Sequence, residues 1–266
     1  MLDLEYAQAS DPGRTRDHNE DYLGYVIPSS PAPLEAQGWL FALADGVGGQ
    51  DRGEVASRTA VESLIAGFKR AQNGESYFNL LPRLVKAANT RVFETGMATG
   101  VSGSSMATTV VACAFRHDRM VVCHVGDSRC YLIRHRHAEA LTRDHTVTGE
   151  QVRLGLMSAR EASGSANRHL LSRSLGNAMF VNVDTGERQV LPGDVLLQCS
   201  DGLHNALGAG EMAEIVAAHN RLEEAVHQLV DVANRKDGSD NISVQLIRVK
   251  SVERVGMYRG RPYKLA

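Results

Sequence analysis

Short runs of apolar and β-branched residues, divided by brief polar turns, are the feature that most restricts how this chain folds. Runs of about four to eight such residues are typical of buried strands. They lie at 39–44, 108–115, 120–125, 130–133, 195–199 and 242–249. Because only short turns separate the three runs between Thr108 and Ile133, we expect these three to form an antiparallel meander.

Segments with helical periodicity divide the strands into groups. Apolar residues recur at helical spacing in 61–68, 81–92 and 222–233, as on the buried face of an amphipathic helix. The segment Thr142–Ser174 is polar, contains glycines and has no sustained period, which predicts an excursion over the surface. Strands clustered apart from helices predict an α+β fold built in layers.

Bulk composition excludes several classes of partner. The 266 residues are 43% hydrophobic and carry a net charge of -2, so no overall field attracts nucleic acid or an acidic membrane. No run reaches the length of a membrane span, and the first residues lack the basic start of a signal peptide. The four cysteines include no C-x-x-C pair and fit a reducing compartment. We therefore expect a cytoplasmic protein.

Acidic residues stand at the ends of several expected strands. Asp45 and Asp201 directly follow apolar runs and precede a glycine, Asp127 follows the run 120–125, and Asp240 precedes the last run. Each one alone is explained as well by ordinary turn chemistry. Their recurrence instead favours an oxygen-only site for magnesium or manganese, since neither zinc ligand clusters nor a calcium loop pattern occurs.

Two neighbouring features extend this interpretation, and each keeps a simpler alternative. Gly46 is either a turn residue or a position that lets a backbone carbonyl approach a cation. Arg16 is either a solvated side chain or a guanidinium that forks onto phosphate oxygens, and its spacing to Glu20 and Asp21 favours the second.

Six motifs, taken in chain order, resemble the series found in the metal-dependent protein phosphatases, the type 2C or PPM family, in its bacterial form. They are Arg16-x-x-Asn19-Glu20-Asp21, Ala44-Asp45-Gly46-Val47-Gly48-Gly49, Gly103-Ser104-Ser105-Met106-Ala107-Thr108-Thr109, Val125-Gly126-Asp127-Ser128-Arg129, Ser200-Asp201-Gly202 and Ser239-Asp240-Asn241. The resemblance extends from about the tenth residue to about Val249.

The resemblance implies an α+β fold, a β-sandwich of two antiparallel sheets flanked by pairs of α-helices. It implies one catalytic domain over residues 1–250, in which about 142–174 is the family's flap beside the active site. Residues 251–266 are then a short basic tail.

The resemblance also implies a metal site with two core Mn²⁺ or Mg²⁺ ions and a weaker third. Asp45 would bridge the core ions, and the Gly46 carbonyl would ligate the second. Asp201 and Asp240 would hold the first, and Asp127 with Asp201 would hold the third.

The remaining site residues receive supporting roles from the same resemblance. Glu20 and Asp21 would form the outer shell of the metal site, and Arg16 would bind phosphate. The implied reaction is hydrolysis of phosphoserine and phosphothreonine in protein substrates by direct attack of water activated by the two ions. The enzyme would be a monomer that opposes bacterial-type serine/threonine kinases. An inactive binding module of the same fold and a hydrolase of small phosphoesters remain alternatives.

One position departs from the family pattern. Many eukaryotic members carry a histidine, proposed as the general acid, where this chain has Val47. Our hypothesis is that a water on the third ion at Asp127 supplies the proton, with His145 and His18 as weaker candidates. The flap also lacks the His-Pro pair of many bacterial members and has 166–169 (ANRH) near its end.

Overall fold

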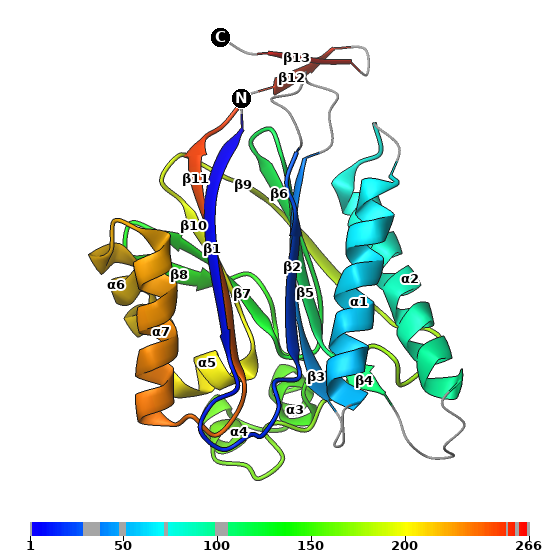
Figure 1. The fold of residues 1–266 in the computed structure, drawn as a ribbon, viewed down its shortest axis with the longest axis vertical. Helices are drawn as coiled ribbons and strands as arrows, with labels where there is room; N and C mark the ends of the chain where they lie inside the picture. The colour runs from blue at the N-terminus through cyan, green and yellow to red at the C-terminus, as the bar shows by residue number, and fades with distance from the viewer. Residues whose placement is uncertain are drawn as a thin grey trace.

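The computed structural model describes residues 2–28, 38–47, 52–71, 74–98, 106–253, 255–258 and 261–264. Two antiparallel sheets pack face to face, and helices cover the outer face of each, as Figure 1 shows. This arrangement confirms the predicted α+β sandwich. The motif residues Gly48, Gly49 and 103–105 lie outside the described residues.

Within the described part of the chain, the first sheet has the order β2-β3-β5-β6-β9, with β4 paired to β3. Its strands are β2 (Asp21–Val26), β3 (Trp39–Val47), β4 (Ala107–Thr108), β5 (Val110–Arg116), β6 (Arg119–Val125) and β9 (Asp184–Gln189). The helices α1 (Arg52–Lys69) and α2 (Tyr77–Ala98) pack on its outer face.

The second sheet has the order β1-β11-β10-β7-β8. Its strands are β1 (Asp3–Asp11), β7 (Arg129–Arg134), β8 (His137–Ala140), β10 (Val195–Cys199) and β11 (Ile242–Ser251). The helices α5 (Asp201–Ala206), α6 (Ala209–Ala218) and α7 (Leu222–Lys236) cover its outer face. Both helix layers were expected as pairs, and the short α5 is an addition that matters for the site.

The apolar pattern of β3 follows from its position between two packed layers. Leu40 and Ala42 face the α1–α2 layer, whereas Phe41 and Leu43 face the space between the sheets, and all four are fully buried. A strand buried on both faces reads as a continuous apolar run. Burial of such side chains, at about 25 cal/mol per Å² of apolar surface, is the main driving force for this packing.

The predicted meander is wrong in its third strand. β5 and β6 pair as a hairpin in the first sheet, but β7 pairs with β10 and β8 in the second. The chain crosses between the sheets at 126–128, where Gly126 has φ of 106°. Apolar composition predicts a buried strand but carries no information about which sheet a strand joins.

Three further segments differ in detail from the sequence expectation. β3 continues through Asp45 to Val47 instead of stopping at a turn before the acid. The segment 142–174 holds two short helices, α3 (Val147–Arg153) and α4 (Ala159–Ser163). Near the chain end, β12 (Val255–Tyr258) and β13 (Arg261–Lys264) pair as a hairpin, which Figure 1 shows at the end of the sandwich opposite α3 and α4. Among the described residues, no helix is both long and apolar enough to cross a membrane.

Candidate metal centre

A pocket of about 580 Å³ lies at the end of the sandwich where β3 ends and β11 begins. All the predicted site residues except Asp21 line it, and they are Arg16, Glu20, Asp45, Gly46, Asp127, Asp201 and Asp240. Asp21 is 7% exposed and lies behind the pocket wall. The fold therefore brings together side chains from five separate segments of the chain.

Asp45 lies on β3 directly opposite Asp21 on β2. Thr109 fixes the Asp45 backbone, since its N–H donates to Asp45 O at 2.8 Å and its Oγ1 accepts the Asp45 N–H at 3.0 Å. Opposed residues of antiparallel strands project from the same face, so two like charges lie close together. Burial, followed by the charges of Asp21 and Asp201, raises the pKa of Asp45 well above its usual range.

Asp21 has one satisfied and one unsatisfied carboxylate oxygen. Its Oδ2 accepts a hydrogen bond from Ser200 Oγ at 2.8 Å, whereas Oδ1 is buried and has no hydrogen-bond partner among the described residues. Burial is the largest cause that raises its pKa to about 7. A buried carboxylate oxygen without a donor is destabilising unless a cation or ordered water meets it.

Asp201 and Asp240 reach the pocket from either side of the three last helices in the chain: Asp201 begins the first of them, and Asp240 follows the last. Asp201 is the first residue of α5, and Asp240 stands just before β11. Burial, followed by the charge of Asp240, raises the pKa of Asp201. Arg16 Nη2 donates to Asp240 Oδ2 at 2.9 Å, and its side chain stays 52% exposed. The guanidinium is thus accessible from the pocket.

Gly46 stands where no side chain fits. A Cβ there would lie 2.2 Å from Gly53 O and 2.7 Å from Glu20 O, because the start of α1 and the loop before β2 both close on this residue. The Gly46 N–H donates to Glu20 O at 3.1 Å. The absence of a Cβ allows three backbone segments to meet beside Asp45.

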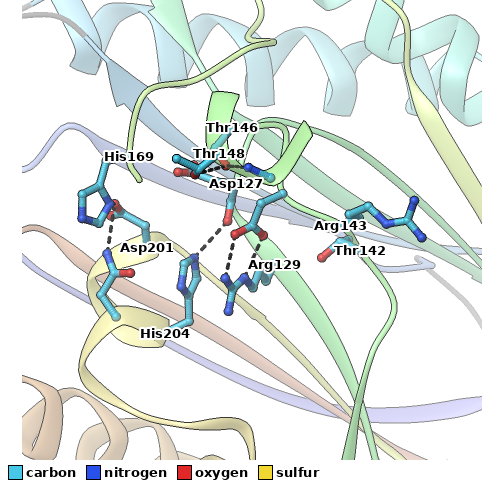
Figure 2. Close-up of polar contacts among 12 residues, drawn as sticks. Asp127, Arg129, Thr142, Arg143, Thr146, Thr148, His169, Asp201 and His204 are labelled. Carbon is cyan, nitrogen blue, oxygen red and sulfur yellow. Dashed lines mark hydrogen bonds and ion pairs between the residues drawn. The ribbon is translucent and has the colours of Figure 1, made fainter. Parts of the chain in front are cut away.

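Asp127 lies in the turn between β6 and β7 and is 7% exposed. Burial, followed by the charge of Asp201, raises its pKa to about 7. His204 Nε2 donates to the Asp127 carbonyl at 3.0 Å, a contact drawn in Figure 2. Just after the turn, Arg129 donates two hydrogen bonds to Asp144, at 2.8 and 2.6 Å.

A second group of potential ligands, His124, His145 and Asp184, lies behind the β6–β7 turn, with ligand atoms within 4.8 Å of one another. His145 Nδ1 accepts the N–H of Gly126 at 3.1 Å. Burial lowers the pKa of His145 to about 4, so the neutral ring carries its proton on Nε2, which faces Asp184 at 3.4 Å. A protonated nitrogen cannot bind a metal, and Arg173 already contacts Asp184 at 2.8 Å. This cluster does not fit a cation.

The pocket itself fits hard divalent cations. Burial and neighbouring carboxylates raise the pKa of Asp45, Asp127 and Asp201, and Asp21, which lies opposite Asp45, has a buried oxygen without a partner among the described residues. A divalent cation would relieve both the repulsion and the missing contact. Carboxylate and carbonyl donors suit Mg²⁺ and Mn²⁺ better than zinc, which prefers histidine and thiolate.

Comparison with known proteins decides the family. The family model for protein phosphatase 2C matches residues 14–243, which is most of the chain. The chain belongs to the protein phosphatase 2C family. Among curated relatives, the serine/threonine phosphatase stp of Listeria innocua is 33% identical over 255 residues. The alignment covers 95% of this chain and 96% of that protein.

Solved structures agree with this assignment. A serine/threonine phosphatase from S. agalactiae superposes with a TM-score of 0.85 at 29% identity, covering 92% of this chain and 99% of that one. The catalytic domain of the serine/threonine protein phosphatase PstP was solved in complex with two manganese ions. It superposes with a TM-score of 0.78 at 31% identity, and the match covers 94% of this chain and 99% of that one. The protein phosphatase 2C fold therefore extends over nearly the whole chain.

Some residues of this phosphatase 2C pocket were not identified from the sequence. His169, in the segment 142–174, lies with Nδ1 3.7 Å from Asp201 Oδ2 and lines the pocket. No local pattern marks it, because its proximity to Asp201 arises only from the path of the segment. Val47 and His18, which were both named from the sequence, line the pocket as well. His145 does not line it and is 2% exposed, which contradicts the hypothesis that it reaches the leaving group.

Proposed function

We propose that this chain is a metal-dependent serine/threonine protein phosphatase. The observation that carries the proposal is the convergence of mutually repelling carboxylates from separate segments on one pocket. Membership of the protein phosphatase 2C family supports the reaction class. The two manganese ions in the related PstP structure support the choice of cofactor.

We assign the metal ligands by motif position, with the pocket geometry as support. Asp45 would be shared by the two core ions, the Gly46 carbonyl would contribute to the second, and Asp201 and Asp240 would hold the first. Asp127, which lines the pocket together with Asp201, would contribute to a weaker third site. Glu20 and Asp21 act from the outer shell, where such residues tune metal affinity.

When bound, the core ions act as Lewis acids that lower the pKa of water and offset charge on the phosphoryl oxygens. Arg16 orients the phosphate, because its exposed guanidinium lies at the pocket beside Asp240. Asp240 in turn restricts the rotamers of Arg16 through their 2.9 Å contact. Positioning of this kind supplies much of the catalysis in phosphoryl transfer.

The leaving serine or threonine oxygen must gain a proton. Val47, which lines the pocket and is 41% exposed, has none to give. The proton therefore comes from water in the pocket or from a histidine that lines it, of which His18 and His169 are the two in the described residues.

The proposal extends to organisation and partners. Residues 1–250 form the catalytic domain, 142–174 serve as the flap beside the substrate, and 251–266 lie outside the domain. The substrates are phosphoproteins modified by serine/threonine kinases, which this enzyme opposes as a cytoplasmic monomer. Four free, buried cysteines are compatible with a reducing compartment.

The test is hydrolysis of p-nitrophenyl phosphate and of matched phosphoserine, phosphothreonine and phosphotyrosine peptides by the purified protein with manganese. The proposal expects turnover of the first two peptides, loss of turnover with a chelator, and loss in Asp45→Asn. Turnover of p-nitrophenyl phosphate alone would indicate a general phosphoesterase. No manganese-dependent turnover of any substrate would indicate a binding module.

A further inference from the structure

The turn that carries Asp127 is a crossing point between the two sheets. The β5–β6 pairing ends at Val125 and the β7–β10 pairing begins at Arg129, so residues 126–128 belong to neither strand ladder. Asp127 shares the pocket with a second acid, Asp201. Contacts other than the strand ladders must therefore hold it in place.

His145 holds the turn at Gly126, its first residue. Its backbone N–H donates to Gly126 O at 3.0 Å, and its ring Nδ1 accepts the Gly126 N–H at 3.1 Å. The ring cannot turn freely, because it stacks on His124 at 4.5 Å between centroids and its Nε2 faces Asp184. Both polar groups of Gly126 are thus satisfied by one residue.

His204 holds the same turn at the next residue, Asp127. Its Nε2 donates to Asp127 O at 3.0 Å, as Figure 2 shows. His204 lies on α5, the helix that begins with Asp201, and the two are separated by about one helical turn. One short helix therefore carries both an acid of the pocket and the contact that fixes Asp127 beside it.

We propose that His145 and His204 are positioning residues that hold the backbone just before and just after the Gly126–Asp127 peptide and so set the Asp127 carboxylate beside Asp201. Neither histidine lines the pocket, so each acts only through Asp127. The inference rests on the proposed function, in which Asp127 and Asp201 share the weaker third cation. It predicts that the two histidines determine affinity for that ion and leave the core ions unaffected.

Matched variants separate the contact from general packing. His145→Ala removes the acceptor for the Gly126 N–H, whereas His145→Asn places Oδ1 where Nδ1 stood. His204→Ala removes the donor to Asp127 O, whereas His204→Gln places an amide N–H near the position of Nε2. Asp127→Ala serves as the reference for loss of the weak site.

The experiment titrates the metal-free, full-length proteins with Mn²⁺ by calorimetry, and measures their thermal unfolding in chelator. We expect the alanine variants to weaken the weakest class of Mn²⁺ sites by about 10- to 100-fold with the tighter sites unchanged. Asn and Gln should restore most of that affinity. Equal weakening in alanine and isosteric variants, in parallel with lower unfolding temperature, would show a merely structural role and overturn the inference.

Other outcomes separate this inference from the proposed function. If wild type binds a weak ion that Asp127→Ala loses, but the histidine variants retain it, only the inference is wrong. If wild type has two tight sites, no weak one and full turnover, the inference and the third site are wrong while the phosphatase stands. If wild type binds no Mn²⁺ and has no turnover, the proposed function itself fails.

Discussion

The acids that line the pocket and the acids just behind it are neutralised in different ways. Behind the pocket, burial acts to raise the pKa of Asp144, but the two hydrogen bonds from Arg129 lower it below its usual value. The pKa of Asp184 is likewise lowered by its hydrogen bond from Arg173, against the opposing effect of burial. In the pocket, burial and neighbouring carboxylates raise the pKa of Asp45 and Asp127.

Arg129 makes the difference instructive, since it lies two residues from Asp127 and yet bonds Asp144. The fold thus has an arginine near the pocket acids and directs it elsewhere. Arginine-paired acids stabilise the loops that carry the site, while most of the pocket acids depend on a positive charge from outside the chain. The following predictions test this division of roles.

The largest effect is expected for Asp45→Asn. Turnover with Mn²⁺ should fall by at least about 100-fold, because a central ligand loses its charge. Stability of the metal-free protein should stay unchanged or rise, since one repelling carboxylate has gone. Kinetics with p-nitrophenyl phosphate and urea unfolding in chelator measure the two quantities. If Asp45→Asn lost turnover because the protein unfolds, Asp45 would have a structural role, and the distinction between pocket acids and arginine-paired acids would be wrong.

Asp144→Ala should instead lower the stability of the metal-free protein. It leaves the Arg129 guanidinium with Tyr131 Oη at 3.0 Å but no carboxylate. Because both side chains are partly exposed, at 31% and 25%, we expect the free energy of unfolding to fall by about 2 kcal/mol, less than for a fully buried pair. Urea unfolding of the metal-free protein measures it. An unchanged stability would mean that the arginine-paired acids have no structural role.

Acid should destabilise the region behind the pocket through His145. Its folded pKa of about 4 lies below the ordinary 6.5, so its contribution is complete above pH 6.5 and is lost as pH falls toward 4. Relative to His145→Asn, the wild type should lose about 2 kcal/mol between pH 7.5 and pH 5. Chemical unfolding of both proteins in chelator at these two pH values tests this. Parallel curves would show that the ring is not buried as a neutral group.

A smaller effect is expected at Gln198, between the sheets. Both of its side-chain polar atoms are buried with no partner among the described residues, and neither an arginine nor the pocket compensates them. Gln198→Met should raise the free energy of unfolding by about 1 kcal/mol, because it removes two unsatisfied groups at similar volume. A loss of stability in urea unfolding would show instead that the amide makes a contact that stabilises the core.

The sequence predicted those parts of the site that local pattern determines. Asp45, Asp201 and Asp240 stand beside apolar runs that do form strands, and the buried stripe of α7 contains the apolar positions expected for 222–233. Strand ends and helix faces are local properties, so periodicity and motif order identify them. All of these acids reach one pocket, as the motif series implied.

The parts that failed depend on contacts between distant segments. No pattern distinguishes a β7 that continues a meander from one that joins the second sheet. His169 and His204 read as ordinary polar positions, and only the folded chain brings them to Asp201 and to the Asp127 carbonyl. β9 (DTGERQ) is exposed and polar, so its alignment with β6 leaves no apolar signal.

The central claim is that the carboxylate pocket, and not the histidine cluster behind it, binds the divalent cations. An anomalous difference map from crystals of the full chain grown with Mn²⁺ tests this directly. The account predicts strong peaks between Asp45, Asp201 and Asp240, with a weaker one beside Asp127. Peaks at His124, His145 and Asp184 with none in the pocket would contradict it.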